Sequence, residues 1–148
     1  MVDDEIIIER LALLRNELAY LKSEEKGVPR LQDYLESPRL RRAVERSLQV
    51  AIEACLDIGR RIISEKGLRF PEDNRDVFKS LAEKGLIPHS LLSRLVKMAQ
   101  FRNLIIHNYA RIEDSQVYSV LKRDLADFEE FARLVAGCLE SASDTALK

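Results

Sequence analysis

Apolar residues recur every three or four positions along most of the chain, the spacing that gives a helix one buried face. The first such run predicts a helix that begins at Asp3 or Asp4 and is ended by Gly27 and Pro29. A second helical segment opens around Leu31. The apolar positions of the first helix are Ile7, Leu11, Leu14, Leu18 and Leu21.

The longest apolar stripe follows Ser37 and Pro38, a pair typical of a helix start. Serine accepts a hydrogen bond from the first turn, and proline fits the first helical position because no amide hydrogen is needed there. The pattern predicts one helix up to Lys66, with Gly67 as its stop. Its stripe consists of Leu40, Val44, Leu48, Ala51, Cys55, Ile58 and Ile62.

A loop over residues 70–74 separates this long helix from a short one, which Gly85 closes as a C-terminal cap. Pro88 then begins a fourth helix that is predicted to run to about Tyr109. The apolar positions are Val77, Phe78 and Leu81 in the short helix, and Leu91, Leu92, Leu95, Met98 and Phe101 in the fourth.

The last helix is predicted as one continuous segment from Glu113 or Asp114 to about Ser141. The small polar tail over residues 142–148 is expected to fray. Four substantial helices and one short helix joined by short loops favour antiparallel neighbours. We therefore expect an all-α, up-and-down four-helix bundle with one additional short helix, in a single domain over residues 1–141.

Composition narrows the function classes. The formal net charge is −1, so the chain is no broad polycation and any contact with RNA must be local. Cys55 and Cys138 lie in apolar patterns and are expected to be reduced core residues, and neither histidine is spaced to join them at zinc. The chain has no signal-peptide pattern and no apolar run of membrane-spanning length. We expect a cytoplasmic protein without cofactor, metal or membrane.

Polar groups stand out in the otherwise apolar fourth helix: Arg102, Asn103, His107 and, at its predicted end, Tyr109. Burial of such groups costs about 1–3 kcal/mol each when they are unpaired, so their presence needs a reason. At about 100° per residue, Asn103 stacks below His107 and Arg102 nearly eclipses Tyr109. One arc would then present all four groups. Ile106 falls within this arc, which indicates an apolar neighbour such as a dimer partner.

A purely structural interpretation is also open. Arg102 would then be an ion-pair partner of Glu53 or Asp57, and His107 would cap the end of its helix. Polar residues repeat every three or four positions along the long helix, as a solvated face or as a wall that faces a cleft. They are Arg46, Gln49, Glu53, Asp57 and Arg60.

Arg102, four residues, His107, one residue and Tyr109 together resemble the signature of HEPN-domain proteins. The match is closest to the HepT-like toxin branch, whose pattern has the same spacing. Residues 42–54 resemble the second long helix of that branch, and the likeness covers about residues 1–140.

The resemblance implies a metal-independent endoribonuclease that works as a homodimer, with the motifs of two copies facing each other in a cleft. Arg102 would bind the scissile phosphate and His107 would act as general acid or base, while Asn103 would orient His107 or a phosphate oxygen. Glu53 or Asp57 would support Arg102 from the polar wall.

The resemblance also implies a toxin–antitoxin pair, in which a nucleotidyltransferase antitoxin adds AMP to Tyr109. The added charge and bulk would exclude the RNA substrate. The alternatives are a HEPN module that docks a nucleotidyltransferase or holds a nucleotide without cleaving RNA, and a purely structural dimerisation domain. The second alternative leaves the polar arc of the fourth helix unexplained.

Overall fold

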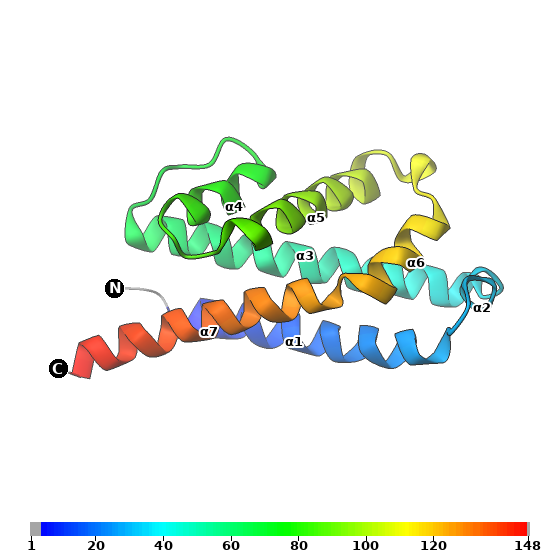
Figure 1. Ribbon diagram of the computed structural model, residues 1–148, viewed down its shortest axis with the longest axis horizontal. Helices are drawn as coiled ribbons and strands as arrows, with labels where there is room; N and C mark the ends of the chain where they lie inside the picture. The colour runs from blue at the N-terminus through cyan, green and yellow to red at the C-terminus, as the bar shows by residue number, and fades with distance from the viewer. Residues whose placement is uncertain (1–3, 148) are drawn as a thin grey trace.

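The computed structural model describes the backbone of residues 4–147 and the side chains of residues 5–140 (Figure 1). Helices and short turns make up this part of the chain, and it contains no strand, which confirms the predicted all-α class. The elements are α1 (Asp4–Gly27), α2 (Leu31–Leu35), α3 (Pro38–Lys66), α4 (Asn74–Glu83), α5 (His89–His107), the 3₁₀ turn η1 (Tyr109–Arg111), α6 (Asp114–Arg123) and α7 (Leu125–Leu147).

Helix α3 lies at the centre of the bundle, with α4 and α5 along one side and α1 and α7 along the other (Figure 1). Both of its predicted ends are confirmed. The hydroxyl of Ser37 accepts a hydrogen bond from the amide of Leu40 at 3.2 Å, with Pro38 in the first turn. Gly67 ends the helix at φ 63°, in the left-handed region that favours glycine. The site residues of α3 are therefore fixed by a helix with defined ends.

The core is built from the apolar stripes of all the long helices. Its largest fully buried side chains include Tyr34, Phe78, Phe128 and Phe131. The rings of Phe78 and Phe131 meet edge to face with centroids 5.9 Å apart, which joins α4 to α7. Cys55 is buried and free, as predicted, and burial raises the pKa of its thiol.

Two predicted helix boundaries are wrong. Helix α5 ends at His107, because Asn108 leaves the helical conformation (φ −137°, ψ 46°) and starts the 3₁₀ turn η1. Asparagine favours such exits because its side chain competes for backbone hydrogen bonds. Tyr109 is therefore not on α5, and the expectation that it eclipses Arg102 on one helical arc is wrong.

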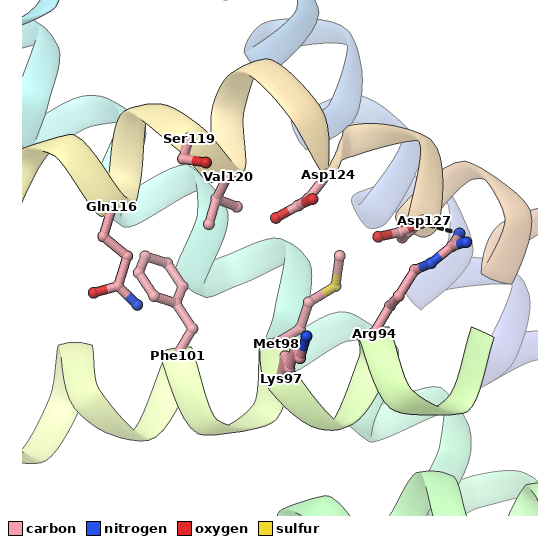
Figure 2. Close-up of a pocket in the computed structure, with 9 residues that line it drawn as sticks. All are labelled: Arg94, Lys97, Met98, Phe101, Gln116, Ser119, Val120, Asp124 and Asp127. Carbon is pink, nitrogen blue, oxygen red and sulfur yellow. Dashed lines mark hydrogen bonds and ion pairs between the residues drawn. The ribbon is translucent and has the colours of Figure 1, made fainter. Parts of the chain in front are cut away.

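The predicted last helix is two helices, α6 and α7, separated at Asp124. The amide of Asp124 still bonds the carbonyl of Val120 at 2.9 Å, but its own carbonyl accepts from the amide of Asp127 at 3.1 Å, in a tighter turn. Asp127 is buried and pairs with Arg94 of α5 at 3.0 Å. Figure 2 shows this pair and Asp124 at the edge of a cavity of about 380 Å³ between α5 and the α6–α7 junction. The break thus directs Asp127 toward α5.

Several expectations fall at the ends of the chain. Asp4 begins α1, whereas Asp3 lies outside the described residues. The backbone of α7 is described to Leu147, and the side chains of residues 141–148 lie outside the described part, so a frayed tail over 142–148 stays a prediction. The domain limits of 1–141 likewise stay a prediction. Among the described helices, none combines the length and the apolar character that crossing a bilayer requires.

Gly59 of α3 packs tightly against Val77 and Leu81 of α4. A Cβ atom placed there would lie 2.6 Å from Cγ1 of Val77 and 3.4 Å from Cδ1 of Leu81. Valine is stiff at χ1 and cannot turn away freely. We expect Gly59→Ala to lower the free energy of unfolding by about 1–3 kcal/mol, measured by denaturant titration.

Gly137 of α7 is the matched control, because a Cβ atom there would meet nothing within 4 Å. Gly137→Ala should raise stability by up to about 1 kcal/mol through helix propensity alone. If both variants were equally stable, the packing of α3 on α4 described here would be wrong.

Candidate active site

Arg102 points from α5 toward α3. Its Nη2 atom lies 3.3 Å from Oε1 of Glu53, and its Nη1 atom lies 3.3 Å from Oδ1 of Asn103. The Arg102 side chain is 22% exposed and that of Glu53 is 34% exposed, so water reaches part of the pair. Of the two acidic partners considered from the sequence, Glu53 is the one that pairs. Asp57 instead forms an ion pair with Arg10 of α1 at 3.4 Å.

A chain of hydrogen bonds extends this pair across three helices. Gln49 donates to the same oxygen of Glu53 at 3.1 Å. The side-chain oxygen of Asn103 also accepts from Asn74 of α4 at 3.2 Å, and Asn74 in turn accepts a hydrogen bond from Arg60. The side-chain oxygen of Asn103 therefore links Arg102 of α5 to Asn74 of α4. Sequence reasoning missed Asn74, because it was predicted to lie in a loop and its contact with Asn103 spans 29 positions.

The polar residues that repeat along α3 do not all contact the same neighbour. Gln49 and Glu53 face Arg102, and Arg60 reaches Asn74 at the edge of α4. Arg46 is exposed and makes no side-chain hydrogen bond or ion pair within residues 5–140. Of the two interpretations left open for this stripe, a wall toward α5 fits Gln49 and Glu53, whereas Arg46 is solvated and Asp57 pairs with α1.

His107 is the last residue of α5 and is exposed. It makes no side-chain hydrogen bond or ion pair with the other described residues. Five positions separate it from Arg102, so the two groups flank one face of the helix end rather than stack on it. Ile106 beside it is 38% exposed. The C-terminal turns of α5 thus combine a restrained cation, an accessible imidazole and an exposed apolar side chain.

Tyr109 stands in η1, directly beyond the helix end. Its hydroxyl donates to Oε2 of Glu45 at 2.8 Å, while the residue is 57% exposed. The hydrogen bond and the negative charge of Glu45 raise the pKa of the Tyr109 phenol, burial adds to this, and Arg42 opposes it. Sequence reasoning missed Glu45, although it lies four positions before Gln49 on the same face of α3.

A shallow cavity of about 230 Å³ lies beside the Tyr109 hydroxyl. One cation on its wall, Arg41, pairs with Asp114 of α6 at 2.8 Å. The lining residues are Pro38, Arg41, Arg42, Glu45, Tyr109, Ile112 and Asp114. Neither here nor in the rest of the described part is a group of three or more His, Cys, Asp or Glu residues placed to hold a metal ion.

Comparison with known proteins identifies the family of the chain. The family model described as "Ribonuclease HepT-like" matches residues 7–135. The chain belongs to the ribonuclease HepT-like family. This confirms the HEPN resemblance read from Arg102, His107 and Tyr109, whose individual roles it does not test.

Two curated relatives of this HepT-like chain are named as nucleases. "mRNA nuclease HepT" of Shewanella oneidensis is 36% identical over 89 residues, which cover 60% of this chain and 67% of that protein. "tRNA nuclease HepT" of Aphanizomenon flos-aquae is 27% identical over 134 residues, 90% of each chain. A solved structure of a tri-AMPylated HEPN toxin from S. oneidensis with MNT antitoxin matches at a TM-score of 0.82 and 30% identity, over 93% of this chain and 99% of the toxin.

The contact between Glu45 and Tyr109 makes a spectroscopic prediction. We expect Glu45→Gln to lower the pKa of the Tyr109 phenol toward the ordinary range of tyrosine, because the carboxylate charge that favours the neutral phenol is lost. The measurement is an alkaline titration of ring-labelled tyrosine by NMR. Tyr109→Phe identifies the signal among the four tyrosines. An unchanged pKa in Glu45→Gln would mean that the two side chains do not meet in solution.

Proposed function

We propose that this HepT-like chain is an endoribonuclease toxin that cleaves RNA with Arg102 and His107 and needs no metal ion. The observation that carries the proposal is the placement of Arg102, restrained by Glu53 and Asn103 yet partly exposed, on the same helix end as the accessible His107. Membership of the ribonuclease HepT-like family and the two relatives named as nucleases support the choice of substrate class. The proposal includes a cytoplasmic location, where an mRNA or tRNA substrate would be met.

Arg102 is proposed to bind the scissile phosphate. A guanidinium presents paired N–H groups that match two phosphate oxygens, and these bonds strengthen as charge builds on phosphorus. In the free chain Glu53 occupies one side of this group at 3.3 Å, a long contact for a charge-assisted bond. RNA would replace Glu53 as the anionic partner, while the bond to Asn103 keeps the guanidinium in place.

His107 is proposed as the general acid or base. It takes the proton from the ribose 2′-hydroxyl as that oxygen attacks phosphorus, or gives one to the departing 5′-oxygen. The bond from phosphorus to the 5′-oxygen breaks as the bond to the 2′-oxygen forms. Side-chain acid–base chemistry of this kind balances without a metal ion.

A second copy of the chain is proposed to complete the site. Ile106 is 38% exposed on the helix end that carries Arg102 and His107, so a partner surface there would bury apolar area. In a two-fold dimer the same patch meets itself, which brings two copies of the motif to one groove.

Tyr109 is the proposed point of control by a nucleotidyltransferase antitoxin. The residue is 57% exposed and follows His107 by two positions, so an added adenylate would place negative charge beside the RNA site. The AMPylated HEPN toxin with MNT antitoxin, similar in fold to this chain, supports the choice of partner and modification.

Two observations favour a second candidate, a HEPN module that binds the nucleotidyltransferase or a nucleotide without cleaving RNA. Arg102 is already paired internally with Glu53, and the net charge of −1 offers little general attraction for RNA. The cleavage experiment below separates the two.

Purified protein should cleave RNA with EDTA present. We expect His107→Ala to slow cleavage by about a hundredfold or more, because the proton transfer is lost, and Arg102→Ala to slow it by a similar factor. The measurement is the initial rate of cleavage of an end-labelled RNA.

The other histidine, His89, starts the same helix and is exposed, which makes His89→Ala the matched control with an unchanged rate. Cleavage by His107→Ala at the wild-type rate would contradict the assignment. No cleavage by the wild type in any RNA pool would favour the binding module.

Ile106→Glu should weaken self-association by about tenfold or more, because a charge replaces the apolar side chain at the proposed interface. Sedimentation equilibrium measures the dissociation constant, and the RNA cleavage rate should fall in parallel. Ile8→Glu, on the exposed face of α1, is the control that changes neither. A wild-type chain that cleaves RNA as a monomer would contradict the proposal that two copies form one active site.

A further inference from the structure

The hydroxyl of Tyr109 has an acceptor in place within its own chain. Its O–H donates to Oε2 of Glu45 at 2.8 Å, across 64 positions of sequence. Glu45 is only 8% exposed, although the tyrosine itself is largely open to solvent. A buried carboxylate requires hydrogen-bond donors, so this contact also satisfies Glu45.

We propose that Glu45 accepts the phenolic proton when an adenylyl group is transferred to Tyr109, and that Arg42 in the adjoining cavity holds the transferred phosphate. The inference rests on the proposed function, because it takes Tyr109 as the modified residue. It adds a proton acceptor and a phosphate site, both supplied by the toxin chain itself rather than by the transferring enzyme.

The transfer balances as a simple substitution at phosphorus. The phenolic oxygen of Tyr109 attacks the α-phosphorus of a nucleoside triphosphate presented by the nucleotidyltransferase, and the new oxygen–phosphorus bond forms. The bond from that phosphorus to the pyrophosphate oxygen breaks, and pyrophosphate leaves with the electron pair. The phenolic proton moves along the existing 2.8 Å hydrogen bond to Glu45 and from there to solvent.

The backbone holds the nucleophile in the orientation that this step needs. Within η1, the amide of Arg111 bonds the carbonyl of Asn108 at 2.8 Å, and the amide of Ile112 bonds the carbonyl of Tyr109 at 3.1 Å. These bonds fix the turn, and from it the O–H of Tyr109 points toward Glu45. Because Tyr109 is 57% exposed, a triphosphate can reach this oxygen from solvent.

The cavity beside the hydroxyl contains one uncommitted cation. Arg41 is held by Asp114, whereas Arg42 is exposed and makes no side-chain hydrogen bond or ion pair with the described residues. The charge of Arg42 nevertheless acts on the phenol of Tyr109. Arg42 lines the same cavity as Tyr109, so its guanidinium can neutralise a phosphodiester formed there.

The product state gives Arg42 a further role. After transfer, Tyr109 no longer donates a hydrogen bond and carries a negative phosphodiester next to the carboxylate of Glu45. Like charges at this separation repel, so the modified side chain turns from Glu45 toward Arg42. Arg41 and Asp114 line the same cavity, and the buried phenol of Tyr34 on α2 interacts electrostatically with Tyr109.

The test follows the transfer of labelled adenylate from ATP to the full-length chain by its nucleotidyltransferase partner, from mildly acidic to alkaline pH. We expect Glu45→Gln to lower the initial rate by about tenfold or more at neutral pH, because the proton has no acceptor. Its rate should then climb with pH as phenolate forms unaided, whereas the wild-type rate stays nearly level.

Three further variants separate chemistry from folding. Glu45→Asp keeps a carboxylate and should retain a level pH profile at a reduced rate. Arg42→Gln should lower the rate at every pH without changing the profile. Glu65→Gln makes the same substitution at the far end of α3, where Glu65 pairs with Arg61, and should leave transfer unchanged.

The outcomes distinguish this inference from the proposed function. Tyr109→Phe should take up no label, and labelling of that variant would mean that the proposed function has the wrong modified residue. If Tyr109→Phe stays unlabelled while Glu45→Gln is labelled at the wild-type rate and with the wild-type pH profile, the role of Glu45 is refuted and the proposed function stands.

Discussion

The guanidinium of Arg102 lies against the carboxylate of Glu53, at a depth where neither group is fully buried. An unpaired cation at this depth would be costly, and a fully solvated one would sample many rotamers. The pair removes both problems, because it restrains Arg102 while leaving part of it open to an incoming anion. Asn103 adds a second restraint and ties it to Asn74 on α4. The position of the proposed phosphate-binding group therefore depends on how α3, α4 and α5 pack.

Helix α3 supplies the two carboxylates that contact the proposed site residues Arg102 and Tyr109. Glu53 restrains a cation and Glu45 restrains a hydroxyl, and the two are eight positions apart on one face of the helix. The proposed catalytic groups and the proposed modification site thus share one scaffold. An adenylate on Tyr109 would change the charge near His107, which lies two positions before it. Control by modification then needs only local electrostatics.

The sequence predicts best what local periodicity and capping determine. The ends of α3 follow from Ser37, Pro38 and Gly67, whose preferences act within one turn. The break at Asp124 was not predictable in this way, because the apolar pattern continues across it and the burial of Asp127 against Arg94 is a tertiary contact. Periodicity therefore marks helices more reliably than it marks their interruptions.

In the candidate site, too, residues marked by local spacing were predicted and those that act through long-range contacts were not. The motif residues were found from their spacing and the family resemblance, and Glu53 was one of two acidic partners considered. Glu45 and Asn74 were missed, because their roles arise from contacts across 64 and 29 positions. Asn103 was expected to orient His107 or a phosphate oxygen, whereas its side-chain oxygen accepts hydrogen bonds from Arg102 and from Asn74 of α4. Long-range hydrogen bonds of this kind become visible only when the helices are placed in space.

The most direct test is a crystal structure of the protein with an RNA that carries a 2′-deoxy nucleotide at the cleavage position. This substrate binds but cannot be cleaved, because the attacking hydroxyl is absent. The account predicts that Arg102 leaves Glu53 and donates to the oxygens of the phosphate next to that nucleotide, with His107 facing the ribose. RNA bound elsewhere, with Arg102 still paired to Glu53, would contradict it.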